Sequence, residues 1–115
     1  MTKQMNRAEL QARISANPEV ALLEALPEKY YRDWHLPGAK HMPHDQAKAL
    51  APVLVPDKNR EIVLYCASET CENSHIAARE LIQLGYANVA VYGGGKRDWS
   101  EAGLPKEAGA AAVKG

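Results

Sequence analysis

Two cysteines five positions apart are the residues of this chain best suited to covalent chemistry. Cys66 directly follows an apolar run, and Cys71 lies in the polar segment behind it. The thiolate is the nucleophilic form of cysteine, and backbone N–H groups of a tight loop or a first helical turn stabilise this anion. Two cysteines do not make the disulfide framework of a small secreted domain, so a chemical role explains them better than a structural disulfide.

The segment with both cysteines lies between a predicted strand and a predicted helix. Residues 61–65 are brief, β-branched and preceded by turn-forming residues, which predicts a strand that ends directly before Cys66. From Ser74 the apolar residues recur at helical spacing and stop at Gly85. Ligands of open α/β sheets gather at the carboxyl ends of strands, so this position favours a functional loop. The alternative is that Cys66 is only the buried end of a strand, since cysteine is among the most buried residue types.

Helix and strand patterns alternate along the rest of the chain. Asn6 and Glu9 form a capping-box pattern ahead of a predicted helix over 7–16. The further segments are a strand at 20–23, a short helix or turn at 28–34, a short strand ending at 42, a helix at 45–54, a strand at 89–92 and a helix at 96–102. This alternation predicts parallel β-α-β units with right-handed crossovers, and therefore the α/β class.

Length and composition predict one small domain. We expect a flexible N-terminus over residues 1–6, a single domain over 7–105 and a flexible Ala/Gly-rich tail over 106–115. The 14 Lys and Arg balance the 14 Asp and Glu, which speaks against binding to nucleic acid. No uncharged stretch is long enough to span a membrane, and the first residues lack the apolar core of a secretion signal. The expected location is the thiol-reducing cytoplasm.

Several short motifs stand in a characteristic order. In the second half they are Ile-Val-Leu-Tyr-Cys at 62–66, Ser-His-Ile-Ala-Ala at 74–78, Gly85-Tyr86, Asn88-Val89, Gly94-Gly95 with Trp99, and Gly103-Leu104-Pro105. In the first half, His-Leu-Pro-Gly-Ala at 35–39 is similar to a His-Ile-Pro-Gly-Ala element, and Glu24 closes the first predicted strand. From about Arg7 to Pro105 the sequence resembles the rhodanese family.

The resemblance implies a fold and an activity. The fold would be a five-stranded parallel sheet flanked by helices, and the activity that of a sulfurtransferase. Cys66 matches the catalytic cysteine of the family, which takes up sulfane sulfur as a persulfide and passes it to a thiol or another thiophilic acceptor. The loop that would cradle the substrate and its anion comprises Ala67, Ser68, Glu69, Thr70, Cys71, Glu72, Asn73 and Ser74.

The implied chemistry needs neither an organic cofactor nor a metal. Cys66, Cys71 and His75 are potential zinc ligands, but a fourth ligand and the spacing of a zinc finger are missing. The expected partners are a small sulfane-sulfur donor or a protein persulfide and a thiol acceptor, with no nucleic acid and no membrane. We expect a monomer or a weak dimer.

Departures from the family pattern bear on the donor. The loop is longer than usual and has Glu72-Asn73 where a basic residue commonly precedes the serine, while Leu26 replaces a frequent arginine. If Glu69 and Glu72 point inward, they repel a dianion such as thiosulfate. The longer loop instead favours a bulkier donor, such as a persulfide on a small thiol or on a protein.

Two other functions remain open. Rhodanese-like folds also serve as non-catalytic binding or regulatory modules, and the lack of a loop cation favours this role. A thiol redox protein that uses Cys66 and Cys71 is the third hypothesis. We interpret Cys71 as a bystander, because Cys-x4-Cys is not the redox spacing Cys-x-x-Cys. The favoured model is therefore a simple transferase in which Cys66 alone carries the sulfur.

The remaining candidates are interpreted as structural. The resemblance makes His35 structural, whereas His41 and His44 are expected to be exposed to solvent. Gly93-Gly94-Gly95 predicts a tight turn that lets the backbone approach the Cys66 loop. Packing in the core is the expected role of four aromatic side chains, Tyr30, Tyr31, Trp34 and Trp99.

Overall fold

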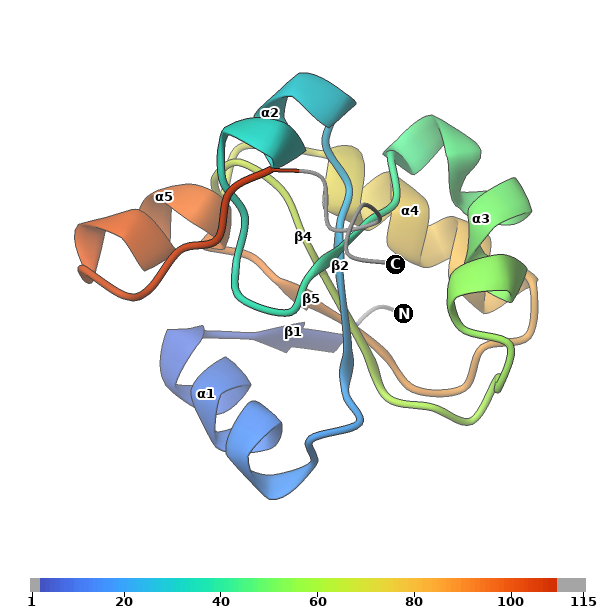
Figure 1. The fold of residues 1–115 in the computed structure, drawn as a ribbon. Coiled ribbons are helices and arrows are strands. Elements are labelled where there is room, and N and C mark those ends of the chain that lie inside the picture. Colours follow the sequence, from blue (N-terminus) through green and yellow to red (C-terminus); the bar gives the residue numbers. More distant parts are fainter. Residues whose placement is uncertain (1–2, 110–115) are drawn as a thin grey trace.

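The sheet at the centre of the molecule has five parallel strands (Figure 1). The computed structural model describes residues 3–109. The strand order is β1-β5-β4-β2-β3, and every neighbouring pair runs parallel. The strands are β1 Lys3–Met5, β2 Ala21–Glu24, β3 Lys40–His41, β4 Ile62–Tyr65 and β5 Val89–Tyr92. The predicted α/β class and the five-stranded parallel sheet are confirmed.

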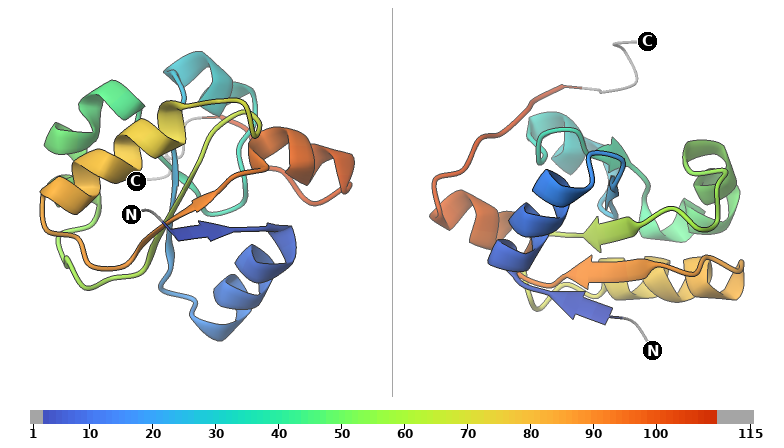
Figure 2. Two further views of the ribbon diagram at one scale, coloured as in Figure 1. Left: turned by 180° about the vertical axis from the view of Figure 1, so that it is seen from behind. Right: turned by 90° about the horizontal axis from the view of Figure 1, so that it is seen from below.

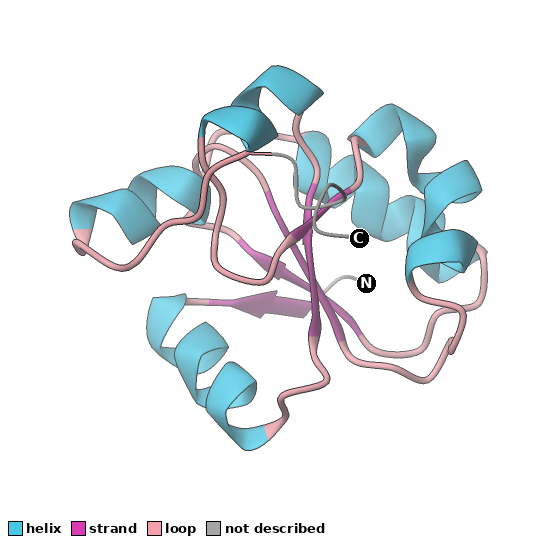
Figure 3. Cartoon of the chain, in the orientation of Figure 1, coloured by secondary structure: helices cyan, strands magenta, loops and turns pink. Residues whose placement is uncertain are grey.

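Helices cover both faces of this sheet (Figures 2 and 3). Apolar side chains of α3 and α4 pack on one face, and those of α1 and α5 pack on the other. The helices are α1 Arg7–Ala16, α2 Glu28–Asp33, the 3-10 turn η1 His44–Gln46, α3 Ala47–Leu54, α4 Asn73–Gln83 and α5 Gly95–Glu101. Within residues 3–109, no helix has the length and apolar character that crossing a membrane requires.

The continuous apolar run ahead of Cys66 forms strand β4, which buries side chains on both faces of the sheet. Ile62 and Leu64 face the cluster under α3 and α4, while Val63 and Tyr65 face the cluster under α1 and α5. All four side chains are fully buried, because a central parallel strand is covered on both faces. Each such side chain contributes roughly 1.5–3 kcal/mol by leaving water, so the strand that ends at Cys66 is firmly held.

Both predicted termini of the domain differ from the structure. Lys3–Met5 forms β1 and pairs with Ala90–Tyr92 of β5, and Met5 is buried, so these residues are not a flexible N-terminus. At the other end, Glu107 forms a two-way backbone bridge with His35, and Gly109 N donates to Arg32 O. Pairing across the fold orders segments that are too polar or too rich in small residues to order themselves. The expectations for residues 1–2 and 110–115 fall outside the described residues.

Candidate active site

Cys66 is the first residue beyond the carboxyl end of β4, and it is 2% exposed. Its carbonyl accepts a hydrogen bond from Lys96 N at 2.9 Å, and the Ala67 carbonyl accepts one from Arg97 N at 2.8 Å. Gly95 has a φ of +62°, and a Cβ at this position would overlap the Cys66 carbonyl oxygen. The glycine turn therefore lets the start of α5 hold the first two residues of the loop, as the sequence predicted.

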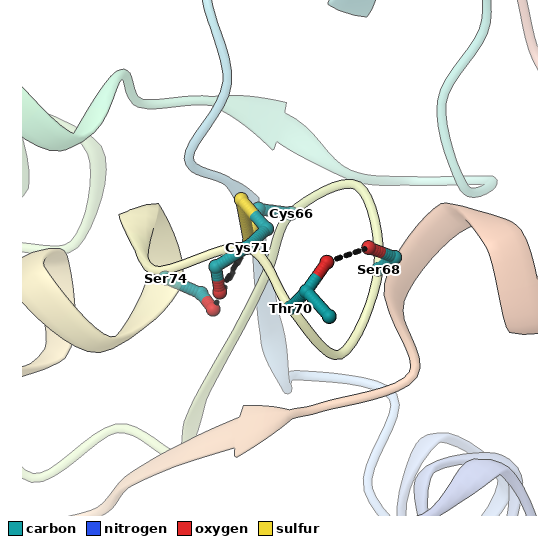
Figure 4. The surroundings of a disulfide bond; sticks show 5 residues. All are labelled: Cys66, Ser68, Thr70, Cys71 and Ser74. Atoms are coloured by element: carbon teal, nitrogen blue, oxygen red, sulfur yellow. Dashed lines mark hydrogen bonds between the residues drawn. A yellow bond between two sulfur atoms is a disulfide. The ribbon is translucent and has the colours of Figure 1, made fainter.

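The loop beyond Cys66 makes one turn and returns to the start of α4 (Figure 4). Cys71 N donates to Ser68 O at 3.0 Å, which closes this turn, and the Ser68 and Thr70 hydroxyls lie 3.1 Å apart. These two hydroxyls lie on the side of the loop away from the Cys66 sulfur. Of the hydroxyl side chains in the predicted loop, only that of Ser74 is brought to the sulfur.

The first turn of α4 supplies polar groups beside the Cys66 sulfur. The Ser74 hydroxyl is buried and lies 3.4 Å from Cys66 Sγ. Glu72 occupies the N-cap position but makes no side-chain hydrogen bond to the helix. Because the first N–H groups of a helix have no partner within the helix, this end of α4 favours an anion at Cys66 Sγ.

Cys71 is joined to Cys66 by a disulfide, with their Cα atoms 6.3 Å apart. Cys66 is buried, whereas Cys71 is partly exposed to solvent. Cys71 therefore lies next to Cys66, and its part in the chemistry stays a prediction. The spacing alone did not indicate this contact, because a curved loop brings two cysteines together irrespective of a known redox spacing.

A buried ion pair lies next to the loop, and sequence analysis missed its cation. Lys96 Nζ is 3.0 Å from a carboxylate oxygen of Glu24, whose side chain is fully buried. Tyr65 donates to the other carboxylate oxygen at 2.7 Å, and Lys96 also donates to Tyr30 O. A buried carboxylate needs a partner, and Leu26 in place of an arginine was the signal that this partner comes from elsewhere.

Burial is the largest influence on the pKa values of Glu24 and Tyr65. Burial is the largest influence on the pKa of Glu24 and raises it, while the hydrogen bonds from Tyr65 and Lys96 act in the opposite direction. Burial and the neighbouring carboxylate also raise the pKa of Tyr65, so its hydroxyl stays a donor. Tyr65 OH in turn accepts from Leu36 N at 3.1 Å. The cluster thus ties the ends of β2 and β4 to the start of α5.

The histidines divide into one confirmed and two wrong predictions. His35 is buried, stacks on the Tyr31 ring at 3.8 Å and donates through Nδ1 to Tyr31 O, which confirms a structural role. His41 and His44 are half-buried rather than solvent-exposed, and His41 Nε2 donates to Leu26 O at 2.6 Å. The His41 ring also stacks on Tyr31, with ring centres 5.0 Å apart.

The structure also places the residues weighed as zinc ligands and the four aromatic side chains expected in the core. No three His, Cys, Asp or Glu side chains within residues 3–109 are placed to hold a metal ion. Trp99 is buried and donates to Pro105 O, as expected for the core, and Tyr31 is buried too. Tyr30 is instead exposed, and Trp34 is half-buried with the Lys96 and Lys106 ammonium groups 4.9 and 4.5 Å from its ring centre.

A hollow of about 320 Å³ adjoins the exposed side of the loop. It is lined by Ser68, Glu69, Thr70, Gly94, Arg97, Asp98 and Glu101. Arg97 brings to this hollow the cation that the loop sequence lacks, but it is paired with Glu101 at 3.2 Å. With three carboxylates and one guanidinium, the hollow does not attract a small dianion.

The model of the rhodanese-like domain matches residues 6–102. The chain belongs to the rhodanese-like domain family. This domain is similar to a thiosulfate:glutathione sulfurtransferase of Saccharomyces cerevisiae, at 29% identity over 78% of this chain and 71% of the relative. It is also similar to an HTH-type transcriptional regulator of Mycobacterium tuberculosis, at 34% identity over 92% of this chain.

Solved structures agree with this assignment. A thiosulfate sulfurtransferase from Pseudomonas aeruginosa superposes with a TM-score of 0.82 at 27% identity, over 94% of this chain and 20% of that one. A rhodanese-like domain from Anabaena superposes with a TM-score of 0.81 at 28% identity, over 94% of this chain and 80% of that one. This chain spans 45% of the length of the Mycobacterium regulator, so the rhodanese-like domain occurs in larger proteins of different function.

Proposed function

We propose that the domain is a sulfurtransferase that carries sulfane sulfur as a persulfide on Cys66 and passes it to a thiol or another thiophilic acceptor. The observation that carries this proposal is the position of Cys66 Sγ beside Ser74 Oγ at the uncapped start of α4. A hydroxyl donor and helix N–H groups stabilise a thiolate, which is the form that attacks sulfur. The sulfurtransferase relatives support the same reaction.

The transfer has two steps at one sulfur atom. The Cys66 thiolate attacks the outer, sulfane sulfur of the donor, and the rest of the donor leaves with the electron pair of the broken bond. In the second step an acceptor thiolate attacks the outer sulfur of the Cys66 persulfide, and Cys66 leaves as a thiolate. Both steps need Cys66 in its reduced form, so we place the domain in a thiol-reducing compartment such as the cytoplasm.

The charges around the loop disfavour thiosulfate as the donor. Glu69 and Glu72 are exposed on the loop, and the adjoining hollow has more acidic than basic side chains. Replacing Glu72 with Arg is therefore expected to raise the rate with thiosulfate, because it removes one repulsive charge and adds an attractive one. A steady-state assay of sulfite release, with Glu80→Arg on α4 as the control, would show whether the loop charge matters.

The decisive experiment is intact-mass spectrometry of reduced protein after treatment with glutathione persulfide and, separately, with thiosulfate. The Cys71→Ser variant keeps Cys66 from forming the disulfide, and it is expected to gain the mass of one sulfur atom. The Cys66→Ser variant is expected to gain none. A folded Cys71→Ser variant that takes up no sulfur from either donor would overturn the proposal.

A non-catalytic regulatory module is the second candidate. The similarity to a transcriptional regulator over 92% of the chain favours it. The mass experiment separates the two functions, because a module that only binds a partner gains no covalent sulfur.

A further inference from the structure

The disulfide points to a second fate for sulfur carried by Cys66. We propose that Cys71 is a resolving thiol, which attacks the Cys66 persulfide, releases the outer sulfur as hydrosulfide and leaves the Cys66–Cys71 disulfide. This inference rests on the proposed function, because it needs the persulfide. It gives the domain an additional activity, the reduction of sulfane sulfur to sulfide.

Cys71 lies within disulfide distance of Cys66. The Cα separation of 6.3 Å lies within the range of about 4.4–6.8 Å that is usual for protein disulfides. In the structure with the disulfide, Cys66 O accepts from Lys96 N, and Cys71 N donates to Ser68 O. The Ser74 hydroxyl lies beside the Cys66 sulfur in the same structure. The attack is therefore compatible with every contact that holds the start and the end of the loop.

Burial of Cys66 gives Cys71 an advantage over external acceptors. With 2% of its surface exposed, Cys66 offers an external thiol little access to its sulfur. Cys71 stands in that loop, and it is tethered at an effective concentration in the millimolar range or above, as is typical of short linkers. An internal attack is therefore expected to precede attack by a dilute external thiol.

The step balances without an external oxidant. The Cys71 thiolate attacks Cys66 Sγ, the bond between this atom and the outer sulfur breaks, and the outer sulfur leaves as hydrosulfide with the electron pair. The sulfane sulfur is reduced, and the two cysteines are oxidised to the disulfide. Two molecules of a thiol reductant then restore both cysteines and become one disulfide themselves.

The environment of the two sulfurs sets the direction of this reduction. Cys71 is partly exposed, so an external thiolate attacks its sulfur first. Cys66 then leaves as the thiolate that Ser74 and the start of α4 stabilise. The reductant therefore forms its mixed disulfide with Cys71, and Cys66 is free for the next donor.

Single-turnover treatment with glutathione persulfide tests the proposal. Reduced, desalted protein receives one equivalent of this donor without oxygen, and sulfide and intact mass are measured together. The wild-type domain is expected to release one sulfide and to lose two hydrogens without gaining sulfur. Cys71→Ser is expected to keep the sulfur mass and to release sulfide at least about tenfold more slowly until a thiol is added. Ser15→Ala, an exposed change on α1 outside the loop, is expected to behave like the wild type.

The outcomes separate this inference from the proposed function. If the wild type and Cys71→Ser both retain the added sulfur, Cys71 does not resolve the persulfide and only the sulfurtransferase remains. If neither takes up sulfur nor releases sulfide, the proposed function fails. If Cys71→Ser carries a glutathione adduct in place of a single sulfur atom, the disulfide arises without a persulfide and both proposals fail.

Discussion

The two ends of the sheet each contain a carboxylate paired with a cation, yet the pairs differ in burial. Glu24, at the carboxyl end of β2, is fully buried with Lys96, whereas Glu61, just before β4, is partly exposed and bound to Arg13. Burial raises the pKa of Glu24. The hydrogen bonds from Arg13 lower the pKa of Glu61, which outweighs its slight burial. The Glu24–Lys96 pair thus loses its contact with water when the protein folds, which costs free energy. The Arg13–Glu61 pair at the other end of the sheet stays hydrated.

The difference indicates what each pair does. Arg13 makes two hydrogen bonds to Glu61, at 2.7 and 2.9 Å, and holds the end of α1 near the start of β4. Lys96 is instead adjacent to Gly95 and donates its backbone N–H to the Cys66 carbonyl. A buried ion pair does not by itself show that a protein is stable. Removing one of its two partners, however, leaves the other as an unpaired buried charge, which is strongly destabilising. We infer that the Glu24–Lys96 pair positions the Cys66 loop.

The largest effect is expected for Lys96→Met, which leaves the Glu24 carboxylate buried without its cation. Loss of one partner of a buried pair costs about 3–5 kcal/mol of unfolding free energy. Urea denaturation measures this loss. Arg97→Met is the control, since this neighbouring side chain is exposed and its ion pair with Glu101 is exposed too. Equal unfolding free energies of Lys96→Met and Arg97→Met would contradict the claim that burial makes the Glu24–Lys96 pair more important than an exposed pair.

The second effect concerns Gly95, where Ala adds both backbone strain and a clash with the Cys66 carbonyl. Gly103 provides the matched control, because its φ is +71° but its Cβ position is empty. Gly103→Ala is expected to cost about 1 kcal/mol for the left-handed backbone alone. Gly95→Ala is expected to lower the unfolding free energy by more than twice as much as Gly103→Ala, and to slow the loading of sulfur onto Cys66. Similar unfolding free energies for both variants would show that the contact of α5 with the loop is unimportant.

The third prediction uses the opposite pKa shifts of the two carboxylates. Because the pKa of Glu24 is raised, its contribution to stability is complete below its unfolded value of about 4.5 and is lost as the pH rises through the folded pKa. For Glu61, with a lowered pKa, the contribution is present above that value and is lost as the pH falls through the folded pKa. Each unit of pKa shift corresponds to about 1.4 kcal/mol.

Denaturation of Glu24→Gln and Glu61→Gln between about pH 3 and pH 7 measures these contributions. Relative to the wild type, Glu24→Gln is expected to gain stability as the pH rises, and Glu61→Gln to lose it. Parallel curves for the two variants would mean that burial does not distinguish the two carboxylates.

The smallest effect is expected for Arg13→Gln, because Arg13 is exposed and its pair is hydrated. Its melting temperature should fall only slightly, and the difference from the wild type should shrink further in about 1 M salt, where charges are screened within roughly 3 Å. The loss in Lys96→Met should persist at the same salt concentration. If the melting temperature of Arg13→Gln stayed below that of the wild type by the same amount at high salt, the Arg13–Glu61 pair would have a structural role beyond the attraction of its charges.

Local patterns in the sequence predicted most of the elements and the place of Cys66. The capping box of Asn6 and Glu9 is present with both hydrogen bonds, and α1 spans the predicted residues 7–16. The apolar run before Cys66 is the buried strand β4. Each of these signals lies within a few residues of the feature it predicts, so the neighbouring side chains are sufficient to read it.

Contacts between distant segments decided the features that sequence analysis missed. Lys3–Met5 became a strand only because β5 offers it an edge, and Lys96 became the partner of Glu24 because α5 starts beside the end of β2. Nothing near these residues in the chain signals either contact. The pairing of Cys71 with Cys66 likewise depends on the curvature of a loop that is held at Gly95 and at the start of α4. Spacing and residue type thus placed Cys66 at the end of a strand, while packing across the sheet selected its neighbours.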